Sequence, residues 1–590
     1  MLSAEISARY QEWLNAPWCD EATKAELQGL QHNEKEIEDR FYCELEFGTG
    51  GMRGLLGAGT NRMNIYLIRR LTQALADCIS EHGPEAKARG VAISYDSRRF
   101  SRQFAEEAAL VLAANQIKAY LFVELRPTPT LSFAVREKHA IAGIMITASH
   151  NPKEYNGYKV YWEDGGQLPP EQADVIIAKM QERNSWQIET ADLAEAQAKG
   201  LLEIMGPELD DVYVERVREQ MLNRQMSAAR GGNLNLIYTP LHGTGAKLVE
   251  RILRENGFAS LHIVQEQAVP DTEFRTVAVP NPEEADAWRL AEKLAEKLES
   301  AGQGPVDLLL ATDPDADRLG VCCRKQNGGY QRLTGNQVGV LLAYYIIKQA
   351  KDMGNLPVDG MVIKSVVSTA LANKVVSGLG VTVKDVPVGF KYIGEQIKLM
   401  EESGRGSFLL GFEESLGYLK GTYARDKDAV LAAALVAEAA LYYKEVLNLT
   451  LLQVLDSIYA KFGYFLDTQV ACTLSGIDGR EQIAEIMRIL RADERPEIGG
   501  LAVSQREYFD RAEVWDSESN AIKPLDFPKV DMLGFALADG GFIRVRPSGT
   551  EPKIRFYFCI SGQNAEDAAN KVQAVQQDFF KPISQYIKKF

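Results

Sequence analysis

Short runs of apolar or β-branched residues, each ending in small or polar residues, occur in three successive groups of three. They lie at residues 90–98, 117–130 and 142–152, then at 233–245, 261–271 and 306–318, and then at 360–368, 381–390 and 407–415. Runs of this length and composition predict strands. Because their order is the same each time, we expect three domains of similar topology.

Stretches with the 3.6-residue period of an amphipathic helix lie between these runs, for example at residues 101–115 and 284–300. Strands that alternate with helices predict α/β layers with mostly parallel sheets. From about residue 465 the pattern changes to strands and turns, followed by one helix at 564–581. We therefore expect an α/β fold with three similar mixed-sheet α/β domains and a smaller C-terminal α+β domain, at residues 1–205, 206–325, 326–463 and 464–590.

Composition and charge limit the function classes. The chain has 590 residues, of which 46% are hydrophobic and 25% charged, and its net charge is −15. At about 150 residues per domain, this length corresponds to about four domains. The surplus of acid argues against a general nucleic-acid or membrane-surface binder, because its field repels phosphate. The sequence shows neither a signal-peptide pattern nor an apolar run long enough to span a membrane. Its seven cysteines are scattered and form no CxxC pair. These features indicate a cytoplasmic protein with reduced thiols.

Ser149 is a candidate nucleophile. It lies in a polar turn directly after the third apolar run of the first group, with His150 beside it and Lys159 close in sequence to handle protons and charge. A turn-forming or helix-capping serine is the alternative interpretation of the same residues. The sequence has no G-x-S-x-G elbow, which disfavours an α/β-hydrolase.

The motif DPDADR follows the third run of the second group and predicts a metal site. Asp313, Asp315 and Asp317 alternate there, and carboxylate oxygens are the ligands that suit a hard cation such as Mg²⁺. A solvated acidic turn is the alternative. An EF-hand loop is excluded, because no glycine stands at its sixth position and no glutamate at its twelfth. Arg318 comes next and is placed to meet an anion or a sugar oxygen.

The third group ends in GFEES, whose Glu413, Glu414 and Ser415 are candidates to accept hydrogen bonds from sugar hydroxyls. Paired carboxylates also occur in glycosidases. Neighbouring residues of a strand point to opposite faces, however, so both glutamates seldom serve one reaction.

Two further segments predict phosphate contacts. In RPSGTEPKIRFY a guanidinium, hydroxyls and backbone N–H groups surround a glycine turn and suit a phosphate dianion; the residues are Arg546, Ser548, Gly549, Thr550 and Lys553. An ordinary basic hairpin is the alternative. The glycine-rich FGTGGMRG at 47–54 matches neither a Walker A loop nor GxGxxG, because Arg53 occupies the third glycine position. Arg53 is a candidate phosphate contact, and a simple turn explains the segment equally well.

In this order, and across nearly the whole chain, FGTGGMRG, TASHNP, DPDADR, EES and RPSGTEPK resemble the motifs of the α-D-phosphohexomutase superfamily. The resemblance is closest to its phosphoglucomutase branch, of the phosphoglucomutase/phosphopentomutase type. It implies four domains around a central cleft, the first three with one α/β topology and the fourth smaller.

The resemblance also implies roles for residues of the first two domains. Ser149 carries the transferable phosphoryl group and, with the three aspartates Asp313, Asp315 and Asp317, binds Mg²⁺. Arg53 and Lys159 stabilise the phosphate in transfer, and Lys159 and His150 take part in proton transfer.

The remaining implied roles concern acid–base chemistry and substrate binding. Lys427, in the motif ARDKDA, is a general acid/base. Glu413 and Ser415 bind sugar hydroxyls, Arg318 contacts the sugar, and Gly389 lies in a turn that approaches it. The clamp for the non-reacting phosphate consists of Arg546, Ser548, Gly549, Thr550 and Lys553.

The implied reaction is an intramolecular phosphoryl transfer on small sugar phosphates. It interconverts α-D-glucose 1-phosphate and glucose 6-phosphate through a phosphoserine enzyme and glucose 1,6-bisphosphate, the activating intermediate. Phosphopentomutase, phosphomannomutase and glucose-1,6-bisphosphate synthase activities are the alternatives. The phosphomannomutase branch has a histidine after its Glu-x-Ser-Gly motif, whereas Ser415 is followed here by Leu416, Gly417 and Tyr418, which favours glucose over mannose. Phe412, where shorter phosphoglucomutases have a glycine, keeps pentose phosphates open. The sequence gives no indication of the oligomeric state.

Overall fold

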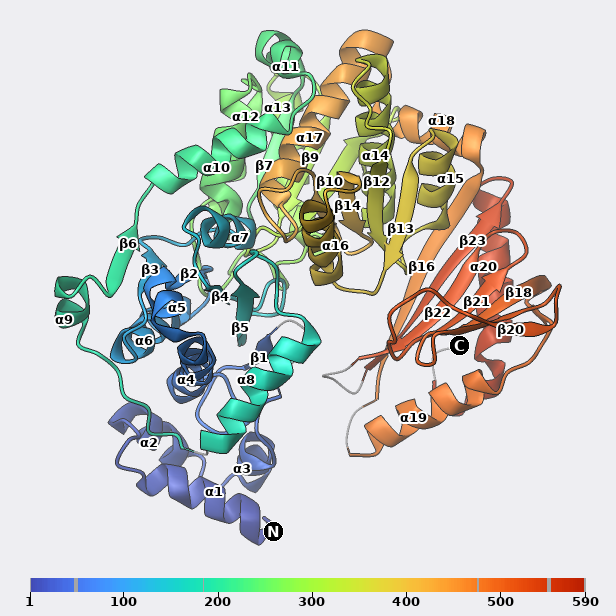
Figure 1. The fold of residues 1–590 in the computed structure, drawn as a ribbon. Helices are drawn as coiled ribbons and strands as arrows, with labels where there is room; N and C mark the ends of the chain where they lie inside the picture. Colours follow the sequence, from blue (N-terminus) through green and yellow to red (C-terminus); the bar gives the residue numbers. More distant parts are fainter. Residues whose placement is uncertain (1, 47–50, 184, 475–476, 549–552, 588–590) are drawn as a thin grey trace. The chain divides into compact units, whose positions relative to one another are not determined.

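Two compact units make up the computed structural model, which describes residues 2–46, 51–183, 185–474, 477–548 and 553–587 (Figure 1). The first unit comprises residues 1–332, 394–399 and 417–441, and the second comprises residues 333–393, 400–416 and 442–590.

The first unit begins with three helices and a six-stranded sheet. The helices are α1 (Ala4–Asn15), α2 (Glu21–Gly29) and α3 (Glu34–Phe41). The strand order is β1-β5-β4-β2-β3-β6. The strands are β1 (Met52–Leu55), β2 (Val91–Tyr95), β3 (Ala119–Phe122), β4 (Ala142–Ile146), β5 (Tyr155–Trp162) and β6 (Leu202–Met205). β2 is parallel to β3 and β4, whereas β5 is antiparallel to β4 and β1.

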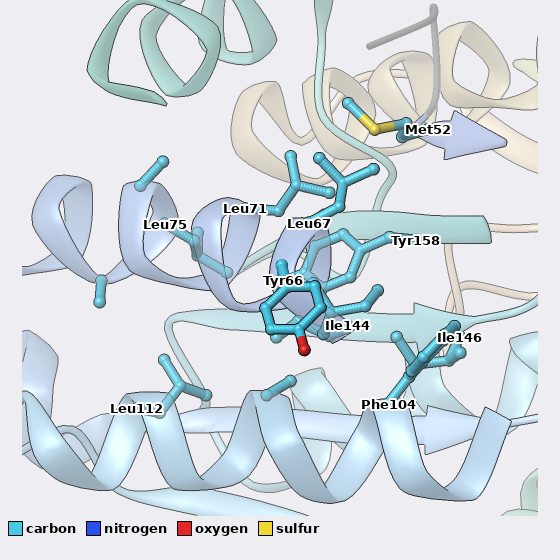
Figure 2. Packing of buried hydrophobic residues seen from close by; sticks show 14 of the residues in the cluster. Met52, Tyr66, Leu67, Leu71, Leu75, Phe104, Leu112, Ile144, Ile146 and Tyr158 are labelled. Carbon is cyan, nitrogen blue, oxygen red and sulfur yellow. The ribbon is translucent and has the colours of Figure 1, made fainter. Parts of the chain in front are cut away.

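Helices α4 (Ile65–Glu81) and α6 (Ser101–Ala114) pack against each other over this sheet and enclose its core (Figure 2). Leu67 and Leu71 of α4 and Phe104 of α6 are buried there with Ile144 of β4. Each helix places apolar residues at intervals of three or four, so one face is buried. The polar ends of the strands remain available for a site.

A second, five-stranded sheet follows in the order β11-β10-β9-β7-β8. Its strands are β7 (Leu236–Thr239), β8 (Leu261–Ile263), β9 (Leu308–Thr312), β10 (Leu319–Arg324) and β11 (Tyr330–Leu333). β7 is parallel to β8 and β9. Helices α12 (Gly245–Glu255) and α13 (Arg289–Ser300) accompany these strands. β11 lies beyond residue 325, where the sequence placed the end of the second domain, because the sheet continues for one more hairpin.

In the second unit, β12 (Gly360–Ser365) is parallel to β13 (Thr382–Val386) and β14 (Ser407–Glu413). Helices α14 (Gly335–Asp352), α15 (Ala370–Gly378) and α18 (Leu451–Phe462) belong to the same unit. The first strand of each of the three groups therefore pairs in parallel with the second and the third. This arrangement confirms the threefold repeat of mixed-sheet α/β domains.

The C-terminal part is rich in β structure, as predicted. Its main path of strands runs β16-β23-β22-β21-β18-β19-β20, with β17 beside β18. The strands are β16 (Tyr464–Thr473), β17 (Glu497–Ile498), β18 (Leu501–Tyr508), β19 (Glu513–Asp516), β20 (Ala521–Pro524), β21 (Leu533–Leu537), β22 (Phe542–Pro547) and β23 (Lys553–Gly562). The expected final helix is α20 (Ala565–Phe580), whereas α19 (Ile477–Arg491) was not expected. Within the described part of the chain, none of the helices is both long enough and apolar enough to cross a bilayer.

Candidate active site

Ser149 lies in a buried loop directly after β4. Its φ of 51° is in the left-handed region, which is uncommon for a residue with a side chain. Its Oγ donates a hydrogen bond to Asp313 Oδ2 at 2.8 Å, and its N–H donates to Thr147 Oγ1 at 2.8 Å. His150 Nδ1 lies 3.3 Å from the same Oγ. The loop therefore turns the candidate nucleophile toward the acidic loop of the second domain.

Three aspartates of that acidic loop converge directly after β9. Asp313, Asp315 and Asp317 are buried, and one carboxylate oxygen from each lies within 4.8 Å of the others. Ala316 adopts the left-handed conformation, with a φ of 49°, in the turn between the last two. The spacing predicted from the sequence therefore produces a compact cluster of carboxylates.

The aspartate cluster fits a divalent cation. Asp315 Oδ1 and Asp317 Oδ1 are buried, and neither has a hydrogen-bond partner among the described residues. A buried carboxylate oxygen without a partner is costly, so a ligand is expected to satisfy it. Oxygen atoms from carboxylates are the donor set that Mg²⁺ binds in proteins.

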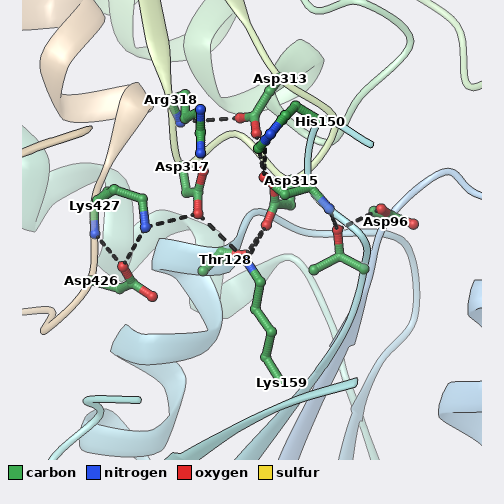
Figure 3. A network of polar contacts seen from close by, with 12 residues as sticks. Asp96, Thr128, His150, Lys159, Asp313, Asp315, Asp317, Arg318, Asp426 and Lys427 are labelled. Carbon is green, nitrogen blue, oxygen red and sulfur yellow. Dashed lines mark hydrogen bonds and ion pairs between the residues drawn. The ribbon is translucent and has the colours of Figure 1, made fainter. Parts of the chain in front are cut away.

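Two lysines contact the same cluster (Figure 3). Lys159 Nζ, from β5, lies 2.7 Å from Asp315 Oδ2 and 3.5 Å from Asp317 Oδ2. Lys427 Nζ lies 3.1 Å from Asp317 Oδ2 and 3.1 Å from Asp426 Oδ1. Burial alone would raise the pKa of Asp317, but the ammonium groups of Lys427 and Lys159 hold this pKa well below its usual range. Asp317 is therefore ionised, and positive side chains balance its charge.

The groups that face Ser149 have perturbed proton affinities. Burial and the charges of Asp315 and Asp317 raise the pKa of Asp313 well above its usual range. Burial and the guanidinium groups of Arg318 and Arg53 lower the pKa of His150 well below 6.5. At neutral pH the imidazole is therefore uncharged.

Two arginines predicted at the site lie at its border. The Arg318 N–H donates to Asp313 Oδ1 at 3.1 Å, and its guanidinium Nη1 lies 3.7 Å from Glu283 Oε2. Arg53, on β1, is exposed and donates from Nη1 to Asn151 Oδ1 at 3.4 Å. Residues 47–50 of its glycine-rich motif lie outside the described residues.

The second unit contains the predicted sugar-binding residues. Glu413 ends β14 and is buried, and its Oε1 accepts a hydrogen bond from the Gly389 N–H at 2.8 Å. Gly389, with a φ of 126°, immediately precedes helix α16 (Phe390–Ser403). Glu414 Oε2 instead accepts a hydrogen bond from Ser365 Oγ at 2.9 Å. The two neighbouring glutamates therefore have different partners, as expected from side-chain alternation, and Ser415 follows them as a partly buried residue.

Phe412, beside the predicted sugar-binding glutamates, lies in the interior of its domain. Its side chain is fully buried against Gly339 of α14, where an added Cβ would overlap the phenyl ring. The residue therefore belongs to the packing of the domain. Activity on pentose phosphates stays an alternative.

The predicted phosphate clamp follows β22 and precedes β23. Arg546 pairs with Arg555 across these antiparallel strands, and the Ser548 N–H donates to the Lys553 carbonyl at 2.7 Å. Gly549 and Thr550 lie outside the described residues. The described part of the motif thus forms the two arms of one hairpin.

Sequence reasoning missed several residues that hold the site together. Asp96 and Arg98 follow β2, and both are buried beside the Ser149 loop. Thr128 Oγ1 donates to Asp315 Oδ2 at 2.9 Å. Asp426 Oδ2 accepts a hydrogen bond from Tyr161 Oη at 2.7 Å. Their motifs carry no local chemical signature, although charged residues at the end of an apolar strand are a signal worth testing.

This arrangement can activate and stabilise a group on Ser149. It combines a hydroxyl, a neutral imidazole, two ammonium groups and a carboxylate cluster suited to a cation. Such groups supply the charge compensation and positioning that phosphoryl transfer requires.

Three family profiles match successive parts of the chain. Domain I of phosphoglucomutase/phosphomannomutase (alpha/beta/alpha) matches residues 44–186, domain II residues 211–328 and domain III residues 334–462. A phosphoglucomutase of Staphylococcus saprophyticus is 34% identical over 567 residues, which is 95% of this chain and 99% of the relative. A phosphoglucomutase of Staphylococcus aureus is 34% identical over 561 residues, which is 95% of this chain and 97% of that relative.

Solved structures share the fold over most of the chain. Parafusin, a phosphoglucomutase from Paramecium in its open form, is 18% identical, with a TM-score of 0.67 and coverage of 92% of this chain and 97% of that one. A phosphoglucomutase/phosphomannomutase family protein from Burkholderia thailandensis is 18% identical, with a TM-score of 0.63 and the same coverage.

Proposed function

The chain belongs to the phosphoglucomutase/phosphomannomutase family, and on that premise we propose that it interconverts α-D-glucose 1-phosphate and glucose 6-phosphate. The observation that carries the proposal is the buried Ser149 Oγ, 2.8 Å from Asp313 Oδ2, in a cluster of three aspartates and two lysines. The curated relatives that match almost the whole chain bear the name of the same activity.

In the proposed cycle, Ser149 carries a phosphoryl group at rest. The 6-hydroxyl of glucose 1-phosphate attacks this phosphorus, the bond from phosphorus to Ser149 Oγ breaks, and glucose 1,6-bisphosphate forms. The bisphosphate turns in the site, Ser149 Oγ takes the phosphoryl group from the 1-position, and glucose 6-phosphate leaves. Each transfer moves one proton from the attacking hydroxyl to the departing oxygen, and His150 and Lys427 are the candidates to hold it.

Charge compensation falls to residues around the transferred group. Lys159 and Arg53 offset the negative charge of the phosphoryl oxygens. A Mg²⁺ ion held by the three aspartates and the Ser149 side chain would act as a Lewis acid on these oxygens.

The second unit supplies the proposed substrate contacts. Glu413 and Ser415 bind sugar hydroxyls near Gly389, and Arg318 of the first unit contacts the sugar. The non-reacting phosphate is bound by the hairpin residues Arg546, Ser548, Gly549, Thr550 and Lys553. We expect a cytoplasmic enzyme that acts on free sugar phosphates, with glucose 1,6-bisphosphate as its activating intermediate.

The decisive experiment combines intact-protein mass with the Ser149→Ala variant. We expect part of the wild-type protein to carry one phosphate on Ser149, and the variant to lose this phosphate and nearly all mutase activity. Ser97→Ala is the matched control, because Ser97 is also buried in the first domain and its Oγ has no hydrogen-bond partner among the described residues. A fully active, unphosphorylated Ser149→Ala protein would refute the proposal.

A substrate comparison separates the related activities. Glucose 1-phosphate is compared with mannose 1-phosphate, ribose 1-phosphate and deoxyribose 1-phosphate, and we expect it to give the largest kcat/KM. Net formation of glucose 1,6-bisphosphate from a separate phosphoryl donor would instead identify a synthase.

A further inference from the structure

The buried guanidinium of Arg98 lies inside the loop that carries Ser149. We propose that Arg98 is a positioning residue, which fixes Ser149 Oγ for phosphoryl transfer without touching the substrate; this role rests on the function proposed above. Arg98 follows β2 and is only 2% exposed. It was not among the residues that the motifs single out.

The Arg98 guanidinium binds four carbonyl oxygens of one loop. Nη2 donates to the carbonyls of Ser149 and Asn151, and Nη1 donates to those of Pro152 and Tyr155, at distances between 2.5 and 3.1 Å. Buried carbonyls need donors, and here one side chain donates to four of them along the segment that leads from the Ser149 turn to the start of β5. The Pro152 carbonyl also accepts from the Tyr155 N–H, at 3.1 Å. Replacing Arg98 would leave four loop carbonyls without their shared partner.

The same group of contacts holds Ser149 from both sides. Its carbonyl accepts from Arg98, while its N–H donates to Thr147 Oγ1, which in turn donates to Asp96 Oδ2 at 2.6 Å. Asp96 also forms an ion pair with Arg98 Nε at 3.2 Å. A left-handed φ at a residue with a side chain persists only where its surroundings enforce it. The Asp96–Arg98 pair provides that enforcement.

A loop of the second domain covers the outside of Arg98. The Phe274 ring centre lies 5.3 Å from the guanidinium carbon, and Phe274 is buried. Beside it, Glu273 Oε2 accepts a hydrogen bond from Lys153 of the Ser149 loop at 3.0 Å. Arg98 is therefore enclosed by the Ser149 loop, Asp96 and an aromatic ring, which restricts the guanidinium to one position.

These contacts separate catalysis from substrate binding. Every carbonyl that the guanidinium binds belongs to residues 149–155, and none belongs to a residue proposed to bind the sugar or the non-reacting phosphate. Loss of the guanidinium would displace Ser149 Oγ, and a displacement of about 1 Å in a reacting group costs on the order of 100-fold in rate. The expected signature is therefore a fall in kcat with little change in KM.

The test uses full-length Arg98→Gln and Arg98→Lys proteins. We expect Arg98→Gln to lose about 100-fold and Arg98→Lys about tenfold in kcat, because an ammonium keeps the charge but lacks the planar fork of donors. KM for glucose 1-phosphate should stay within about twofold of the wild-type value. A reduced kcat with an almost unchanged KM indicates the loss of an interaction that acts in the transition state. Phosphorylation of Ser149 by glucose 1,6-bisphosphate, followed by intact mass, should slow by the same factors.

Arg69→Gln is the matched control, because Arg69 of α4 is also largely buried and pairs with Glu107, at 2.8 Å, away from the Ser149 loop. It should retain wild-type kcat. If Arg98→Gln does not fold, a folded Arg98→Lys decides by the same criteria. Wild-type kcat in a folded Arg98 variant, or a raised KM with unchanged kcat, overturns the positioning role. An inactive wild type that carries no phosphate on Ser149 instead overturns the proposed function.

Discussion

Replacement of Lys159 by methionine tests whether the Lys159 ammonium group stabilises the buried negative charge of the three aspartates. The Lys159 and Asp315 side chains are 3% and 0% exposed, and the 2.7 Å contact between them is the shortest that either lysine makes with the aspartates. Methionine keeps most of the volume of the aliphatic stem but removes the ammonium group. In the metal-free protein, the variant leaves Asp315 with only the Thr128 hydroxyl as a side-chain partner for Oδ2 among the described residues.

The expected loss of stability follows from two independent estimates. Removing one partner of a buried ion pair costs about 3–5 kcal/mol, because the other charge stays buried. Alternatively Asp315 takes up a proton, which costs about 1.4 kcal/mol for each pH unit above an unfolded-state pKa of about 3.9, or about 4 kcal/mol at pH 7. In the wild type Lys159 helps to hold the pKa of Asp315 below its usual range, against burial and the charge of Asp317. In the variant this folded-state pKa is raised instead, so the deficit grows as pH rises, and it falls to about 1.5 kcal/mol at pH 5.

Thermal unfolding in EDTA, followed by tryptophan fluorescence, measures the effect. Four of the six tryptophans lie in the first domain, at positions 13, 18, 162 and 186. For a domain of about 150–250 residues the expected deficit lowers Tm by roughly 6–20 °C at pH 7. Added Mg²⁺ should recover part of it, because the cation compensates the carboxylates.

A surface pair provides the control for this measurement. Lys179 contacts Glu81 at 2.5 Å, but the Glu81 side chain is 62% exposed, so Lys179→Met should leave Tm almost unchanged. A Lys159→Met protein with wild-type Tm in EDTA at pH 7 would show that the buried pair does not compensate the cluster. A deficit that does not shrink toward pH 5 would refute the protonation argument.

Three further predictions concern other parts of the molecule. Gly335→Ala places a Cβ against the Glu414 carbonyl oxygen, so the end of β14 must move. Steady-state kinetics should then show a KM for glucose 1-phosphate raised about tenfold, and an unchanged KM would contradict this. Burial raises the pKa of the Cys19 and Cys78 thiols to about 11 and that of Cys323 to about 12, so mass spectrometry should find them unlabelled by iodoacetamide in native protein at pH 8, with labelling faster as pH rises. EDTA should abolish mutase activity and Mg²⁺ should restore it; full activity in EDTA would exclude a metal role for the aspartates.

Local patterns were sufficient for the nine strands of the threefold repeat. The nine apolar runs became strands because β-branched residues between turns favour an extended backbone and burial on a sheet. Helix α19 was missed, although its buried residues Ile483, Ile486, Met487 and Leu490 recur at helical spacing. This helical spacing could have predicted α19, but the strands on either side of it led to the interpretation of the whole region as strands and turns.

Some residues of the candidate active site could likewise be predicted from the sequence, and others could not. The three aspartates could be predicted from spacing, because alternate residues in one tight turn converge without help from distant segments. The role of Arg98 could not be predicted, because its partners are backbone carbonyls about 50 positions further along the chain. Every residue has a backbone carbonyl, so such a partner has no sequence signature. The direction of the Phe412 ring could not be predicted either, because only the packing against Gly339 decides it.

The sequence by itself determined the strands, the threefold repeat and the identity of the chemical groups, because these depend on residue types within a few positions of one another. The tertiary structure decided which groups meet. Lys159 and Asp315 are 156 positions apart, and Tyr161 and Asp426 are 265 apart. Such contacts arise only when separate sheets pack together. Burial then gives these contacts their effect, because a low-dielectric surrounding strengthens each ion pair and makes each unpaired charge costly.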